Sequence, residues 1–125
     1  MEVTLSDQQK KIIREIEEFA NKQLRPNASR FEEEERLPKE LINQLAVKKI
    51  LGATFPEKYG GLGLDPITYG LVTAEIGKAC CNTRGLLTVH DSIVGETILK
   101  WGSKEQVEKW IPRMAMGEKI GAFAL

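Results

Sequence analysis

The chain has 125 residues, of which 42% are hydrophobic and 29% are charged, and its 18 basic side chains balance 18 acidic ones. This composition is typical of one globular domain, and the zero net charge argues against a nucleic-acid-binding protein, which would carry an excess of basic residues. No apolar run approaches the roughly 18 residues of a membrane-spanning helix and the N-terminus lacks the pattern of a signal segment, so we expect a cytoplasmic protein with no membrane span.

The first predicted helix starts after Ser6, which forms a capping-box pattern with Gln9 three residues later. Pro26 is expected to end this helix, because proline disfavours helical conformation in the residue before it. The four acidic residues 32–35 then indicate a solvated turn or helix end. The helix should bury one apolar face, made of Ile12, Ile13, Ile16, Phe19 and Ala20.

A second helix is predicted to begin at Pro38 and to stop near Gly52. Residues 53–64 contain one proline and three glycines, so they are expected to form a tight connection. Asp65 and Pro66 are a typical N-cap and first residue of a third helix. The inner face of that helix is expected to carry Ile67, Leu71, Val72, Ile76 and Ala79.

The fourth predicted helix, residues 83–101, is apolar on more than one face and should therefore lie at the centre of the fold. Gly102 is expected to stop it, and Ser103 with Gln106 forms a second capping box. A fifth helix follows, which Pro112 should end or kink. These elements predict an all-α fold, a bundle of about five helices.

The two cysteines, Cys80 and Cys81, are adjacent in the sequence, and a disulfide between neighbours would be strained. His90 is the only histidine, and no cysteine pair has the spacing of a zinc site. We therefore expect no metal site, and we predict that both thiols are small buried hydrophobic groups.

Residues 119–125 have the pattern of a β-strand. A single strand cannot pair its own backbone N–H and C=O groups. We therefore expect a larger protein, in which residues 1–118 form an N-terminal all-α domain and residues 119–125 begin a middle β-domain. The alternative is a stand-alone helical module for binding or assembly without flavin, which would leave an unpaired apolar strand prone to aggregation.

Five stretches of the sequence resemble the amino-terminal domain of the acyl-CoA dehydrogenases, the flavoproteins that desaturate fatty acyl thioesters. Each stretch alone is weakly specific, but the five occur in the order of the family, and the resemblance as a whole extends over essentially the entire chain. They are Phe55–Asp65, Thr73–Gly77, Val89–Ser92, Lys100–Gln106 and Trp110–Leu125.

The resemblance implies an FAD-dependent dehydrogenase that removes an α-proton with a glutamate while a β-hydride passes to the flavin. Hydrogen bonds to the thioester carbonyl would make the α-proton more acidic in a desolvated site. Family members assemble as homotetramers or dimers and use an electron-transfer partner. The family's catalytic glutamate comes from the C-terminal half, so we expect no catalytic residue in this chain.

The resemblance also implies where this chain meets cofactor and substrate. Phe123 and Leu125 fall on the first positions of the flavin-binding stretch, although the chain alone is not expected to bind FAD tightly. Leu86, Val89 and Ile93 fall on the wall of the acyl-chain pocket, with plain core packing as the alternative. His90, with no carboxylate partner evident in the sequence, is predicted to be a packing residue and not a base.

Two related activities remain open on the sequence. An acyl-CoA oxidase or a flavin monooxygenase would share the fold and differ at the base and in oxygen access. An acyl carrier protein thioester would present the same reacting group as acyl-CoA, so the sequence does not separate these two substrates.

Overall fold

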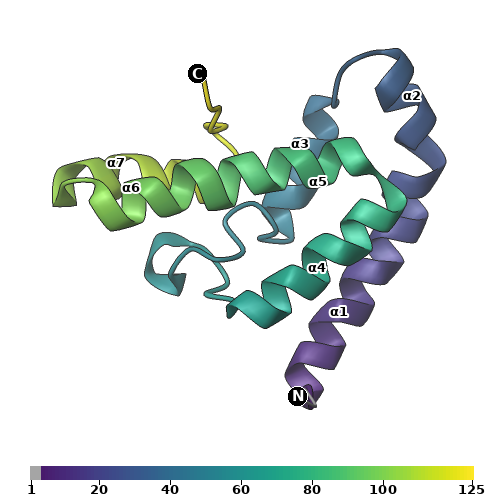
Figure 1. The fold of residues 1–125 in the computed structure, drawn as a ribbon, viewed down its shortest axis with the longest axis horizontal. Helices are drawn as coiled ribbons and strands as arrows, with labels where there is room; N and C mark the ends of the chain where they lie inside the picture. The colour runs from purple at the N-terminus through teal and green to yellow at the C-terminus, as the bar shows by residue number, and fades with distance from the viewer. Residues whose placement is uncertain (1–3) are drawn as a thin grey trace.

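All regular elements of residues 4–125, which the computed structural model describes, are helical (Figure 1). The all-α fold expected from the sequence is therefore confirmed. In chain order the elements are α1 (Asp7–Phe19), the π-helical η1 (Ala20–Leu24), the 3₁₀-helical η2 (Arg25–Asn27), α2 (Ala28–Glu33), α3 (Lys39–Val47), the 3₁₀-helical η3 (Glu57–Tyr59), α4 (Pro66–Ala79), α5 (Cys81–Leu87), the π-helical η4 (Thr88–Gly95), α6 (Glu96–Trp101) and α7 (Lys104–Ala115).

The N-terminal helical run begins as the capping box indicates and continues further than expected. The Ser6 hydroxyl accepts the Gln9 N–H, and the Gln9 side chain accepts the Ser6 N–H. Pro26 does not end the run, because it lies in η2, where helical conformation passes directly from η1 into α2. The acidic residues 32–35 are exposed at the end of α2, as a solvated helix end requires.

The second helix ends earlier than the sequence suggests. α3 stops at Val47, and Lys49 takes up the left-handed conformation with φ of 57°. Gly52 also has a positive φ, 78°, but it lies in the following loop, where a Cβ would come within 2.5 Å of the Phe55 ring. Its role is thus to let the loop close around Phe55, which is completely buried.

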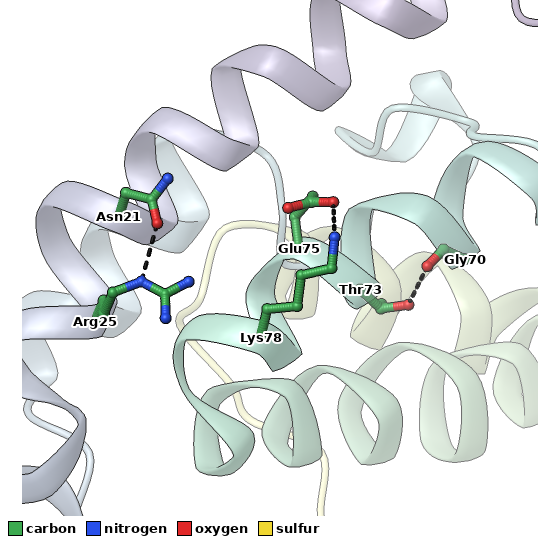
Figure 2. Close-up of polar contacts among 6 residues, drawn as sticks. All are labelled: Asn21, Arg25, Gly70, Thr73, Glu75 and Lys78. Carbon is green, nitrogen blue, oxygen red and sulfur yellow. Dashed lines mark hydrogen bonds and ion pairs between the residues drawn. The ribbon is translucent and has the colours of Figure 1, made fainter.

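α4 starts at the expected N-cap, since the Asp65 side chain accepts the N–H groups of Ile67 and Thr68. Ile67 itself is exposed and not on the inner face, which corrects the expectation for that residue. The buried Thr73 hydroxyl donates back to the Gly70 carbonyl at 3.0 Å, and Glu75 and Lys78 pair at 2.6 Å (Figure 2). The α4 helix therefore satisfies its polar groups locally while it packs against α1.

A change of helix type after α1 is accompanied by a local side-chain hydrogen bond. Asn21, in the π-helical η1, accepts the Arg25 Nε–H at 3.0 Å, across the junction with η2 (Figure 2). This contact is exposed, so it contributes little to the core.

A second continuous helical run covers residues 81–101, where α5, η4 and α6 join without a break (Figure 1). Cys80 is extended, with φ of −155°, and separates this run from α4. Cys80 is buried but Cys81 is exposed, so only one of the two thiols behaves as expected. We refer to residues 81–101 as the central helix.

α7 returns antiparallel beside α6 after a second capping box at Ser103 (Figure 1). Pro112 does not end α7, which continues to Ala115. Two apolar cores result. One joins the N-terminal helices to α4 and α5, and the other surrounds Phe55 with Val107, Ile111, Met114 and Ala115 of α7.

Residues 119–125 have no regular secondary structure, and they leave the bundle beside the central helix (Figure 1). Gly117, with φ of 72°, ends α7, and the N–H groups of Glu118 and Lys119 both bond to the Arg113 carbonyl. The β-strand and the division at residue 118 stay predictions. None of the helices in residues 4–125 is both long and apolar enough to cross a membrane.

Candidate functional site at the central helix

The outer face of the central helix carries apolar side chains that this chain only partly covers. Leu86 and Val89 are half-buried, and Ile93 is 38% exposed. Leu87 and His90, next to them in sequence, are completely buried. The three residues expected to line an acyl pocket thus sit at the surface of the bundle, where a further element or a ligand could cover them.

The π-helical η4 turns two consecutive polar residues, His90 and Asp91, into the interior. Neither exposes any surface to solvent. A π-helix widens the turn by one residue, and such segments occur often at functional sites. In η4 the polar pair faces inward while Val89 and Ile93 remain accessible.

Asp91 is a buried acid with an incomplete set of hydrogen bonds. Its Oδ1 accepts the Gly52 N–H at 2.8 Å, whereas Oδ2 is buried without a partner. Burial raises the pKa of Asp91 to about 7, although the hydrogen bond from Gly52 opposes this rise. The carboxyl group therefore holds the loop after α3 against the central helix.

Tyr69 of α4 extends this polar cluster. Its hydroxyl donates to the Leu87 carbonyl and accepts from the Ser92 hydroxyl, both at 3.4 Å. Burial, and after it the negative charge of Asp91, raises the pKa of Tyr69 to about 12. This cluster was not predicted from the sequence, where Asp91 is one of several polar residues between the apolar positions of the central helix.

His90 is fully hydrogen-bonded within the chain. Nε2 donates to the Met114 carbonyl at 3.2 Å, and Nδ1 accepts the Gly121 N–H at 3.0 Å. Burial lowers the pKa of His90, which favours the neutral ring that this pair of bonds requires. The packing role expected for His90 agrees with this position, because no ring nitrogen remains free to act as a base.

Phe123 and Leu125, the residues expected near the flavin, lie at the exposed end of the C-terminal segment. Phe123 is 60% exposed and Leu125 is completely exposed. An apolar hollow of about 250 Å³ lies where this segment passes α6 and α7. It is lined by Val94, Ile98, Trp110, Met114, Lys119, Ile120 and Gly121.

A larger open groove, of about 570 Å³, lies between α1 and α3 and is lined by Phe19, Val47 and Lys48 among others. It is distant in sequence from every residue expected to bind cofactor or substrate. Within residues 4–125, no three histidine, cysteine or acidic side chains gather as metal ligands would. The central helix and the C-terminal segment therefore remain the candidate site.

The fold and this site define an all-α domain with two apolar surfaces for further contacts. One is the outer face of the central helix, and the other is formed by the exposed side chains of the C-terminal segment. The model of the family "Acyl-CoA dehydrogenase, N-terminal domain" matches residues 6–118, and the chain belongs to that family.

Similar proteins agree with this assignment along nearly the whole chain. The short-chain specific acyl-CoA dehydrogenase of Clostridium acetobutylicum is 33% identical over all 125 residues, which cover 33% of that protein. Among solved structures, butyryl-CoA dehydrogenase from Megasphaera elsdenii is 30% identical with a TM-score of 0.82, covering 96% of this chain and 32% of that one.

A glutaryl-CoA dehydrogenase from Mycobacterium smegmatis, in complex with FADH2, is 29% identical with a TM-score of 0.86. The match covers 93% of this chain and 30% of that one. The chain therefore spans about a third of the length of the relatives it matches.

Proposed function

We propose that this chain is the N-terminal helical domain of an FAD-dependent acyl-CoA dehydrogenase, in which the central helix forms one wall of the acyl-chain pocket. The observation that supports this most directly is the partly exposed apolar outer face at Leu86, Val89 and Ile93. An apolar surface of this kind stabilises a hydrocarbon chain by removing both from water.

The substrate class follows from the relatives together with this face. Each of the three similar proteins described above is named as a CoA thioester dehydrogenase, so acyl-CoA is favoured over an acyl carrier protein thioester. Two of them are named for short chains, and a short acyl group is therefore the first substrate to test.

FAD fits the exposed end of the C-terminal segment in one respect. Phe123 and Leu125 are accessible apolar side chains that could contact a flat aromatic ring, but they bring no polar side-chain group to hold its heteroatoms. When bound, FAD supplies the acceptor for the hydride. The contribution of this chain is to place apolar contacts beside the ring and to exclude water from the pocket wall.

The catalytic base is proposed to lie outside residues 4–125. Asp91 is the one acid that is buried in this part of the chain. Its carboxyl group bonds to Gly52 in the interior and does not face the outer side of the central helix. The exposed glutamates have no buried environment that would suit proton abstraction from carbon.

Other parts of this proposal concern the complete protein. They are the remaining domains, a homo-oligomer of two or four copies, and an electron-transfer partner that reoxidises the flavin. The stand-alone helical module is not favoured, because relatives of about three times this length share the whole of the chain. An oxidase would differ in how rapidly oxygen reoxidises its reduced flavin.

The pocket wall is tested by Val89→Phe in the protein that contains this chain together with its remaining domains. The larger ring should shorten the cavity and exclude the longer acyl groups first. We expect kcat/KM for hexanoyl-CoA to fall at least about tenfold more than that for butyryl-CoA, since each displaced methylene costs about 1 kcal/mol or more.

Glu108→Phe is the control, because Glu108 is exposed on α7 and is not one of the wall residues. It should leave the ratio of the two substrates unchanged. An equal effect of Val89→Phe on both substrates would contradict the placement of Val89 in the pocket wall.

A further inference from the structure

His90 links two parts of the candidate site that the sequence places 31 residues apart. It belongs to η4, between the outer-face residue Val89 and the buried Asp91. Its Nδ1 accepts the N–H of Gly121, in the segment that leads to Phe123 and Leu125. The bond joins the pocket wall directly to the segment expected beside the flavin.

The second ring nitrogen holds His90 in one orientation. Nε2 donates to the Met114 carbonyl in α7 at 3.2 Å, and the ring is completely buried. Because the Gly121 N–H requires a lone pair on Nδ1, the ring must carry its proton on Nε2. Both hydrogen bonds thus specify the same neutral tautomer, and each supports the other.

Gly121 is fitted closely against the same helix. A Cβ at this position would come within 2.8 Å of Val94 Cβ and 3.1 Å of Met114 Cε. The backbone therefore touches η4 itself, one helical turn from His90. Gly117 is also close to its neighbours, since its Cβ would lie 3.1 Å from Ala46 Cβ. The segment after α7 consequently follows one path until Gly121, and the side chains beyond it are exposed.

We propose that His90 is a positioning residue, which places the Gly121 backbone on the central helix and thereby sets where Phe123 and Leu125 stand relative to the acyl-pocket wall. This inference rests on the function proposed above and adds a role within the same site. Positioning of this kind matters because small displacements of a reacting group can cost large factors in rate.

The hydrogen bond is observable without any substitution in the protein that contains this chain together with its remaining domains. In a ¹⁵N-labelled sample at pH 8, the imidazole shifts should show a protonated Nε2 and an unprotonated Nδ1. A scalar coupling should connect Nδ1 with the Gly121 amide nitrogen through the hydrogen bond. A proton on Nδ1 would overturn the inference, because that nitrogen could not then accept the Gly121 N–H.

Two substitutions separate the bond to Gly121 from the bond to Met114. The side-chain oxygen of asparagine takes about the place of Nδ1, and the amide nitrogen of glutamine takes about the place of Nε2. His90→Asn should therefore keep an acceptor for Gly121, whereas His90→Gln should keep only the donor to Met114. We compare the hydrogen exchange rate of the Gly121 amide with that of the Ile111 amide in α7. This ratio should be about tenfold higher in His90→Gln than in wild type, as loss of one buried hydrogen bond implies.

Leu87→Ala is the matched control for general loss of stability. Leu87 is completely buried in the same helical run but belongs to the core formed with the N-terminal helices. It should lower the protection of both amides together. If His90→Gln leaves the ratio of Gly121 to Ile111 exchange at the wild-type value, the inference is wrong.

A second readout keeps this inference distinguishable from the proposed function. In the protein with its remaining domains, His90→Gln should shift the visible absorption spectrum of the flavin relative to wild type. The flavin spectrum of His90→Asn should match that of wild type. A wild-type protein without a flavin spectrum would refute the proposed function while the hydrogen-bond measurements could still succeed. A flavin spectrum that is identical in His90→Gln would refute the positioning role alone.

Discussion

Replacing Asp91 by asparagine should change how the stability of the chain depends on pH. The carboxyl group is completely buried, and burial raises its pKa from an ordinary 3.8 to about 7. Between these two values the folded chain binds more protons than the unfolded chain. The free energy of unfolding therefore falls as the pH rises through this range, and the contribution is lost above the folded pKa.

The size of the effect follows from the rise in pKa. At 1.36 kcal/mol for each pKa unit, a change from 3.8 to about 7 corresponds to a loss on the order of 4 kcal/mol between pH 4 and pH 8. Asparagine does not titrate, and its side-chain oxygen can still accept the Gly52 N–H. Its amide would lack a partner where Oδ2 now lies, which costs about 1–3 kcal/mol at every pH.

Urea unfolding followed by circular dichroism at pH 4, 5, 6, 7 and 8 measures this difference at constant ionic strength. The stability of Asp91→Asn relative to wild type should increase steadily across the series. Burial lowers the pKa of His90, which makes stability rise with pH below its ordinary range, but this contribution is present in both proteins and cancels.

A relative stability of Asp91→Asn that stays constant within about 0.5 kcal/mol from pH 4 to pH 8 would refute this reasoning. It would mean that the carboxyl group is solvated or fully paired in the folded chain. The close contact of the loop after α3 with η4 would then need another explanation.

Two further substitutions test how the site is supported. Gly95→Ala should destabilise the chain by about 2 kcal/mol in urea unfolding, because the new Cβ would clash with the Phe55 ring. This overpacking should outweigh the gain of about 1 kcal/mol in helix propensity. Unchanged stability would mean that the Phe55 ring can move. Ser103→Ala should lower the free energy of unfolding by about 1 kcal/mol in the same assay, because α7 loses its N-cap. Lys104→Ala removes no capping group and should be nearly neutral. Equal effects of the two substitutions would contradict the capping role.

The parts of the fold that local sequence determines were predictable. Ser6, Asp65 and Ser103 cap their helices as expected, because an N-cap needs only a polar side chain and the next few N–H groups. The all-α class and a central helix over about residues 83–101 also follow from patterns within single helices.

The errors arose where packing between distant residues decides the structure. Pro26 is tolerated because the run changes to a 3₁₀ turn at that point, which a rule about regular α-helices does not consider. Gly52 is required by its approach to Phe55 and not by the end of α3. Ile67 and Cys81 are exposed although their residue types usually prefer the interior.

The candidate site was predictable only in outline. Leu86, Val89 and Ile93 were placed by resemblance, and their partial exposure is consistent with that placement without testing it. The bonds from Gly121 to His90 and from Gly52 to Asp91 could not be predicted, because the two glycines lie 31 and 39 residues away and contribute only backbone N–H groups. Backbone donors carry no residue-specific signal in a sequence.

The most direct test is an anaerobic titration of the protein expressed from the complete coding region that contains this chain. The purified protein should show the absorption bands of oxidised flavin, and butyryl-CoA should bleach them before any electron acceptor is added. A protein with no flavin spectrum, or a flavin that no short-chain acyl-CoA reduces, would contradict the assignment of this chain to an acyl-CoA dehydrogenase.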